Sequence, residues 1–145
     1  MKIRAAQTND YQQIAALLQA AKLPVDGVCE HLSHFSVLEE GDQIIGAVGL
    51  EIYGQDALLR SMVVAEKKRG LGLGELLYQT ILREAKQAKL TNLYLLTETA
   101  EAFFAKKGFS RIDRATVTSP VAQSVEFISA CPASAACMHL PVSQA

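Results

Sequence analysis

The chain has 145 residues, 50% of them hydrophobic and 20% charged, which is the balance of one folded domain over residues 1–145 rather than of a disordered chain. Its 14 basic and 15 acidic side chains give a formal net charge of -1, so no overall positive field would attract a nucleic acid. No stretch approaches the roughly 18 apolar residues of a membrane span or resembles a secretion signal, so we expect a cytoplasmic protein with no membrane partner.

The N-terminal part of the chain predicts a strand followed by two helices. Residues 2–6 alternate like a strand, and the apolar residues of 11–21 recur at helical spacing after the capping sequence Thr8-Asn9-Asp10. Pro24 interrupts this helix, and a second short helix is expected over 25–33. We therefore expect a helix pair after the first strand.

Three strands then form an antiparallel meander that leads into a glycine-rich segment. Their predicted ranges are 35–39, 43–53 and 57–64. An amphipathic helix is predicted over 75–89, and a near-continuous apolar run over 92–97 indicates a strand buried on both faces. A short helix over 100–107 stops at Gly108.

The C-terminal part of the chain has weaker patterns. Residues 109–118 predict a further strand, and the tail, 120–145, holds one strand-like run over 125–130 before a stretch rich in Ala, Cys and Ser. The last few residues are expected to be loose. Pairing of the tail's strand with a second copy would hide an exposed edge, so a homodimer is one arrangement that the chain could adopt.

The three cysteines, Cys29, Cys131 and Cys137, lack the spacing of a disulfide framework or a zinc site. An arsenic or copper site formed by Cys131 and Cys137 would make the protein a metal-responsive regulator. The alternative is that both are small buried residues, and on this interpretation we predict no metal.

A glycine-rich segment, Arg69-Gly70-Leu71-Gly72-Leu73-Gly74, follows a strand and opens a helix. Glycines let a ligand approach the main chain, and a helix N-terminus presents N–H groups and the positive end of the dipole, which favours a pyrophosphate. A Walker A loop would need Lys-Ser or Lys-Thr where Glu75-Leu76 stand, which disfavours ATP and GTP. A dinucleotide loop would follow the first strand of a βαβ unit rather than a meander, which disfavours NAD.

The sequence from Val63 to Gly74, VVAEKKRGLGLG, resembles the acetyl-CoA-binding motif of the GNAT N-acetyltransferase superfamily. A second block, Thr97 to Phe109, is similar to the helix and strand that follow the splayed sheet of this family, and the resemblance covers residues 2–112. It implies an acetyl-CoA-dependent N-acetyltransferase that needs no metal. The implied fold class is α/β, a mixed and mostly antiparallel sheet flanked by helices and splayed between the strands over 57–64 and 92–97.

The resemblance also implies which residues bind acetyl-CoA. In the family, main-chain N–H groups of the loop hold the pyrophosphate and the preceding strand pairs with the pantetheine arm. Two phenylalanines of the second block would border the pantetheine and the thiol, unless they are core aromatics. The implied cofactor-binding residues are Met62, Val63, Val64, Arg69, Gly70, Leu71, Gly72, Leu73, Gly74, Phe103 and Phe104.

The catalytic residues are less clearly marked. Many members of the family carry a tyrosine general acid where this chain has Phe104, and phenylalanine cannot donate a proton, so we assign no acid. A carboxylate near the splay is the usual base, and the candidates are Glu51, Glu98 and Glu126. Glu51 ranks first because it lies in an apolar strand beside the presumed acetyl site. The alternatives are a solvent-facing position for Glu51 and a helix-capping role for Glu98.

The acceptor is expected to be a small-molecule amine. Arg60, a guanidinium in an apolar strand, would bind an acceptor carboxylate or pair with Glu51, and Tyr53 and Arg114 could line the pocket. Leu58-Leu59-Arg60-Ser61 and neighbouring segments resemble acetyltransferases of arsenic-resistance operons, which implies a glutamate-like acceptor such as arsinothricin. Leu95-Leu96-Thr97 looks like N-acetylglutamate synthases, which implies an amino acid. The alternatives are a protein-amine acetyltransferase and a non-catalytic acyl-CoA sensor.

Overall fold

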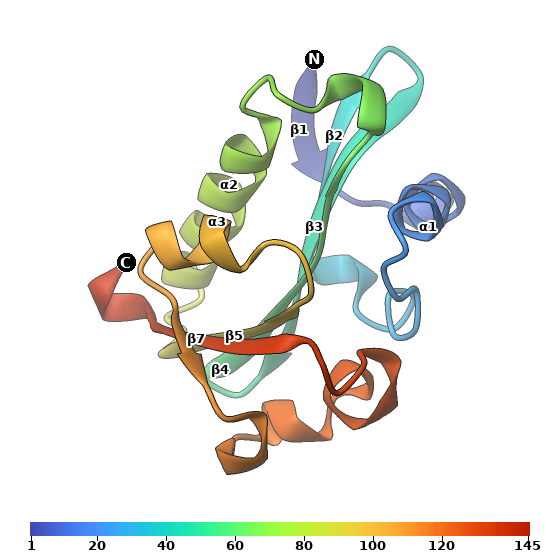
Figure 1. Ribbon diagram of the computed structural model, residues 1–145. Helices are drawn as coiled ribbons and strands as arrows, with labels where there is room; N and C mark the ends of the chain where they lie inside the picture. The colour runs from blue at the N-terminus through green and yellow to red at the C-terminus, as the bar shows by residue number, and fades with distance from the viewer. The chain divides into compact units, whose positions relative to one another are not determined.

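The structure, a computed structural model that describes residues 1–145, combines strands and α-helices (Figure 1). The strands are β1 (Lys2–Ala5), β2 (Phe35–Glu40), β3 (Gln43–Tyr53), β4 (Asp56–Val64), β5 (Asn92–Thr97), β6 (Ser110–Ile112) and β7 (Ala136–Pro141). The α-helices are α1 (Tyr11–Ala20), α2 (Leu73–Gln87) and α3 (Glu101–Lys106). None of the helices is both long enough and apolar enough to cross a membrane.

All seven strands form one mixed sheet in the order β1-β2-β3-β4-β5-β7-β6. β4 and β5 are parallel and pair over three residues each, Asp56–Leu58 with Asn92–Tyr94. The pairs β1–β2, β2–β3, β5–β7 and β6–β7 are antiparallel. The predicted fold class, an α/β fold with a mixed and mostly antiparallel sheet flanked by helices, is confirmed.

Residues of the chain group into two compact units. The first unit contains Met1–Leu50 and Arg60–Glu84, and the second contains Glu51–Leu59 and Ala85–Ala145.

In the first unit, α1 and α2 lie on opposite sides of the β1–β3 strands (Figure 1). α1 places Ile14 and Leu18, one helical turn apart, in the core, where both are 0% exposed. On the α2 side, a Cβ built on Gly46 would lie 3.1 Å from Leu77 Cδ1, so the helix packs closely against β3 there. The buried cluster under α1 contains Ile14, Leu18, Val28, Leu32, Phe35, Val37, Ile44, Ala47 and Val63.

The second short helix that was predicted over 25–33 is absent from the structure. This segment instead makes successive turns and one 3₁₀ helix, Leu32–His34. Gly27 has a φ of 84°, a left-handed conformation that an α-helix cannot contain. Val28 N–H donates to the Val25 carbonyl at 3.2 Å, as in a tight turn. The main-chain carbonyls before Gly27 therefore lack the regular donors of a helix.

In the second unit, β7 runs alongside β5 over six residues and pairs with β6 on its other edge (Figure 1). Both faces of β5 are covered, one more deeply than the other: Leu93 and Leu95 are buried, while Tyr94 and Leu96 are half-buried and pack against a buried cluster of this unit. A buried cluster on this unit's sheet contains Leu58, Val121, Phe127 and Cys137.

The tail differs most from the prediction. The strand expected over 125–130 is a single π-helical turn, Glu126–Ala130, and the strand expected over 109–118 is limited to β6. Asp113 ends that strand early because its carboxylate accepts the Ala115 N–H at 3.0 Å and starts a 3₁₀ turn. The last residues are not loose, since Val142–Gln144 form another 3₁₀ turn. β7 was not predicted, and it is paired on both sides, so it offers no edge to a second copy.

Gly49 provides a stability test of the first unit. It lies directly opposite Phe35 across the β2–β3 pair, and a Cβ at position 49 would be 2.3 Å from Phe35 Cε1. We expect Gly49→Ala to lower the free energy of unfolding by about 1–3 kcal/mol, because the ring cannot move without disturbing the core. Urea denaturation measures this change. Phe35→Leu should recover part of the loss in the double variant, and strictly additive costs would contradict the contact.

Candidate active site

The glycine-rich segment connects β4 to α2 within the first unit. After β4 the main chain makes one 3₁₀ turn, Glu66–Lys68, and it enters α2 at Leu73. Arg69 Nε donates to the Val64 carbonyl at 3.0 Å, so this side chain folds back over the end of the strand. We call residues 69–74 the phosphate loop.

Two glycines of the phosphate loop have a left-handed backbone conformation, and the space around all three is free of other protein atoms. Gly70 and Gly72 have φ values of 82° and 80°, which residues with a Cβ adopt only at a cost. A Cβ built on Gly70, Gly72 or Gly74 would meet no atom within 4 Å, so a ligand has room to approach the main chain. The first turn of α2 adds N–H groups that have no acceptor within the helix. This arrangement fits a pyrophosphate.

Three consecutive cations, Lys67, Lys68 and Arg69, precede the glycines. Lys68 Nζ lies 2.7 Å from Glu40 Oε1 and ties the loop to the turn between β2 and β3. This ion pair holds the pKa of Glu40 below its ordinary value. Lys67 and Arg69 are exposed, so their charge is available to an anion at the loop.

The end of β4 divides its side chains between the core and a half-buried face. Val63 is 5% exposed and packs in the cluster under α1, whereas Met62 and Val64 are half-buried. Leu71, in the loop, is 65% exposed. The alternation leaves Met62 and Val64 on the face that Val63 does not use.

Arg60 lies in β4 immediately before these residues and is 2% exposed. Its guanidinium donates to the Asp26 carbonyl at 2.6 Å and to the Pro24 carbonyl at 3.2 Å, and Nε donates to Ser61 Oγ at 2.9 Å. The buried cation thus receives oxygen partners from the segment that is not helical. Hydrogen bonds of this kind offset the cost of burying a charge.

In the second unit, Glu51 and Tyr53 lie together at the end of β3. Glu51 is 1% exposed, so the alternative of a solvent-facing carboxylate is wrong. The hydroxyl of half-buried Tyr53 donates to Glu51 Oε1. Tyr53 also packs against the buried cluster of this unit, which fixes the ring. The sequence predicted both residues, but not their hydrogen bond.

The other two candidate bases differ in burial. Glu98 is exposed, and Glu126 is 4% exposed in the π-helical turn of the tail. Arg114 holds this turn, because its two terminal nitrogens donate to four main-chain carbonyls between residues 126 and 132 at 2.6–3.2 Å. Its guanidinium also lies 5.6 Å from the centre of the Phe127 ring. Through these contacts Arg114 organises the tail.

The two phenylalanines of α3 have different surroundings. Phe104 is 4% exposed and makes an edge contact with Phe109, with ring centres 5.5 Å apart. Phe103 is half-buried, and Lys107 Nζ lies 5.2 Å from the centre of its ring. Phe104 is thus a core residue of its unit, as the alternative to a cofactor contact anticipated.

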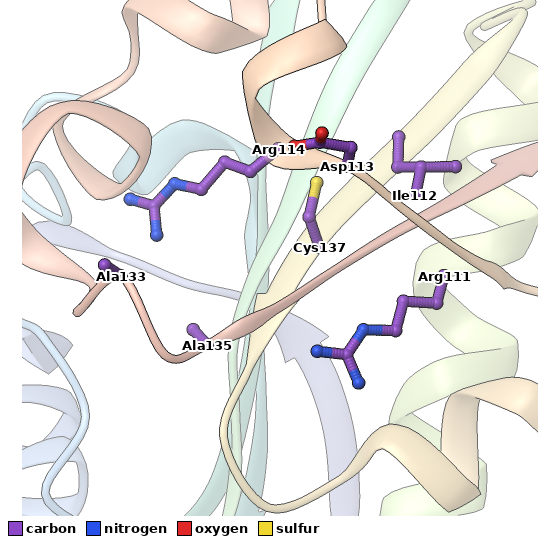
Figure 2. Close-up of a pocket in the computed structure, with 7 residues that line it drawn as sticks. All are labelled: Arg111, Ile112, Asp113, Arg114, Ala133, Ala135 and Cys137. Atoms are coloured by element: carbon purple, nitrogen blue, oxygen red, sulfur yellow. The ribbon is translucent and has the colours of Figure 1, made fainter.

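A cavity of about 430 Å³ lies beside β6 and β7 in the second unit (Figure 2). The guanidinium groups of Arg111 and Arg114 do not converge in it, as Figure 2 shows. Burial raises the pKa of the Cys137 thiol, which favours its neutral form. No group of three or more His, Cys, Asp or Glu side chains could hold a metal ion. The lining residues, which include Arg114 and Cys137 of the sequence analysis, are Arg111, Ile112, Asp113, Arg114, Ala133, Ala135 and Cys137.

Sequence reasoning missed the contacts that buried Arg60 and half-buried Arg114 make with main-chain carbonyls. Arg60 was expected to meet a carboxylate, and its bonds to Pro24 and Asp26 depend on a segment 34–36 positions away in the chain. The available signal was an arginine inside the apolar run Leu58-Leu59-Arg60-Ser61, which shows that acceptors are needed but not where they are.

The chain matches the family model of the acetyltransferase (GNAT) domain over residues 31–111. It is 31% identical over 118 residues to the uncharacterized protein YwlB of Bacillus subtilis, which covers 77% of this chain and 78% of that protein. It is also 28% identical over 129 residues to an amino-acid acetyltransferase of Mycobacterium tuberculosis, which covers 82% of this chain and 74% of that protein.

Among solved structures, the N-acetylglutamate synthase of Neisseria gonorrhoeae in complex with coenzyme A and N-acetyl-glutamate superposes with a TM-score of 0.82 at 19% identity. The match covers 97% of this chain and 35% of that longer chain. At this identity the likeness shows the fold. Coenzyme A is present in that structure and in other solved structures of the same fold.

The phosphate loop can be tested by adding one methyl group. We expect Gly72→Ala to weaken acetyl-CoA binding by about 5–30-fold in titration calorimetry, because alanine at a φ of 80° costs about 1–2 kcal/mol. Gly54→Ala is the matched control, since Gly54 is also left-handed with open surroundings but lies in the turn after β3. This control should bind acetyl-CoA like the wild type, and equal weakening by both would contradict the assignment.

Proposed function

The chain belongs to the GNAT acetyltransferase family, and we propose that this acetyl-CoA-dependent N-acetyltransferase acts on the amine of a free amino acid or a glutamate-like analogue. The observation that supports this proposal is the buried carboxylate of Glu51, which accepts a hydrogen bond from the Tyr53 hydroxyl. Such a carboxylate can receive a proton from an amine. The amino-acid acetyltransferases among the relatives support a small acceptor.

Each part of the donor side has a proposed task. Acetyl-CoA supplies an acetyl thioester when it is bound. Main-chain N–H groups of the phosphate loop hold the pyrophosphate, and the strand edge at Met62 and Val64 pairs with the pantetheine arm. A main-chain N–H at Val63 or Val64 polarises the thioester carbonyl. Phe103, the half-buried member of its pair, borders the thiol end, and Phe104 supports it from the core.

On the acceptor side, we propose that Glu51 removes a proton from the incoming ammonium, directly or through a water. Tyr53 holds the carboxylate by its hydroxyl and restricts its orientation. The amine nitrogen then forms a bond to the acetyl carbon while the bond from that carbon to sulfur breaks. The acetylated nitrogen gives its second proton to a water as that water protonates the leaving thiolate, because Phe104 has no hydroxyl to donate.

Arg60 and Tyr53 are the proposed contacts of the acceptor, and the structure limits how Arg60 can act. Its nitrogens already donate to two carbonyls and to Ser61, so an acceptor carboxylate would share the guanidinium with them. The resemblance to acetyltransferases of arsenic-resistance operons extends the proposed acceptors to glutamate-like organoarsenicals.

A panel of amines tests the acceptor class. We expect thiol release from acetyl-CoA with glutamate or its organoarsenical analogue at a kcat/KM at least tenfold above that for a lysine-containing peptide, because a small site excludes the extended chain. Glutamine, which lacks the side-chain charge of glutamate, and aspartate, which is one methylene shorter, test which property of the acceptor's side chain matters. A preference for the peptide, or no release with any free amine, would contradict the proposal.

Glu51→Gln tests the base. We expect kcat to fall by about 10²–10⁴-fold while the Kd for acetyl-CoA stays the same, because the amide keeps the shape of the side chain but cannot accept the proton. Stopped assays of thiol release and titration calorimetry give the two values. Glu101→Gln, at a carboxylate of α3 whose side chain is 43% exposed and pairs with Arg111, is the matched control and should keep the wild-type kcat. A Glu51→Gln enzyme with full kcat would remove Glu51 from the proposal.

A further inference from the structure

Ser61 has a backbone conformation that is unusual for a strand residue. Its φ is 60°, and the other two non-glycine residues with positive φ, Lys22 and Lys89, follow the ends of α1 and α2. Left-handed residues are common after helices but rare inside strands. Ser61 lies within β4 and is 8% exposed. Because serine disfavours a positive φ, contacts with neighbouring residues must stabilise this backbone conformation of Ser61.

A left-handed residue inside a strand changes the direction of the main chain that follows. Such irregularities re-aim side chains and are frequent next to functional sites. The residues after Ser61 are Met62, Val63 and Val64, which form the strand edge proposed for the pantetheine arm. The orientation of that edge therefore depends on whether residue 61 keeps a φ of 60°.

Arg60 contacts both Ser61 and the non-helical segment around Pro24 and Asp26. Nε donates to Ser61 Oγ at 2.9 Å, and the terminal nitrogens donate to the carbonyls of Asp26 and Pro24 at 2.6 and 3.2 Å. A planar guanidinium fixes the directions of its donors, so all three acceptors are set relative to one another. The hydroxyl of Ser61 can reach Nε only from a restricted range of backbone conformations.

We propose that Arg60 is a positioning residue for acetyl-CoA: it stabilises left-handed Ser61 and thereby sets the strand edge at residues 62–64. The segment around Pro24 and Asp26 serves as the fixed support for the guanidinium. This inference concerns the donor side and does not rest on the identity of the acceptor. It also differs from acceptor binding by Arg60, because it predicts an effect on acetyl-CoA when no acceptor is present.

Rescue by glycine tests the proposal. In titrations of acetyl-CoA without acceptor, we expect Arg60→Met to raise the Kd at least tenfold. The double variant Arg60→Met/Ser61→Gly should return the Kd to within about threefold of the wild type, because glycine adopts a φ near 60° at no cost. Ser61→Val should weaken binding at least tenfold with Arg60 in place, because β-branched residues resist this conformation. This last variant keeps the test valid if Arg60→Met does not fold.

Lys89→Val is the matched control for strain itself. Lys89 has a φ of 58° but lies in the exposed turn after α2, so its substitution should lower the melting temperature without changing the Kd for acetyl-CoA. Two results would overturn the proposal. One is an Arg60→Met variant with an unchanged Kd for acetyl-CoA and a raised KM for the acceptor, which would support acceptor binding instead. The other is a weakened Kd that glycine at position 61 does not restore.

Discussion

A guanidinium that is shielded from water needs oxygen acceptors, and two such groups, buried Arg60 and half-buried Arg114, hold irregular segments of their units. Arg60, 2% exposed, finds carbonyls in the segment that sequence periodicity assigns to a helix. Arg114 donates to two carbonyls in the π-helical turn of the tail and to two in the residues that follow it. In each case main-chain carbonyls that lack the regular hydrogen bonds of a helix or strand accept hydrogen bonds from a guanidinium group. Ser61, next to Arg60, and Glu126, whose carbonyl Arg114 contacts, are held in place by these hydrogen bonds.

The two sides of the reaction place different demands on the chain. In the proposed reaction the donor is recognised by main chain, and the glycine conformations of the phosphate loop leave space around N–H groups for it. The proposed acceptor side needs a side chain that accepts a proton, and Glu51, the proposed base, is buried and accepts a hydrogen bond from Tyr53. Main-chain recognition tolerates changes of side chain, whereas the acceptor side depends on particular functional groups. A family can therefore share its donor motif and differ in its acceptors.

Sequence reasoning succeeded where structure is local and failed where it is not. The β2–β3 hairpin, α2 and the phosphate loop follow from alternation, helical spacing and glycines that are close in the chain. β7 was missed because its residues gain their pairing from β5 and β6, far away in sequence. The left-handed conformation of Ser61 was also invisible, since serine gives no signal for it and the stabilising contact comes from a neighbouring side chain. Burial of Glu51 could be predicted, but its partner could not.

The position of β7 between β5 and β6 also constrains how the protein is made. Residues 136–141 must emerge from the ribosome before the sheet of the second unit can close, although β5 has been exposed since residue 97. Until then, β5 presents an unpaired edge with Leu93 and Leu95 beside it, which is a template for association with other nascent chains. During synthesis there is thus an interval in which the edge of β5 that β7 will cover is open to association.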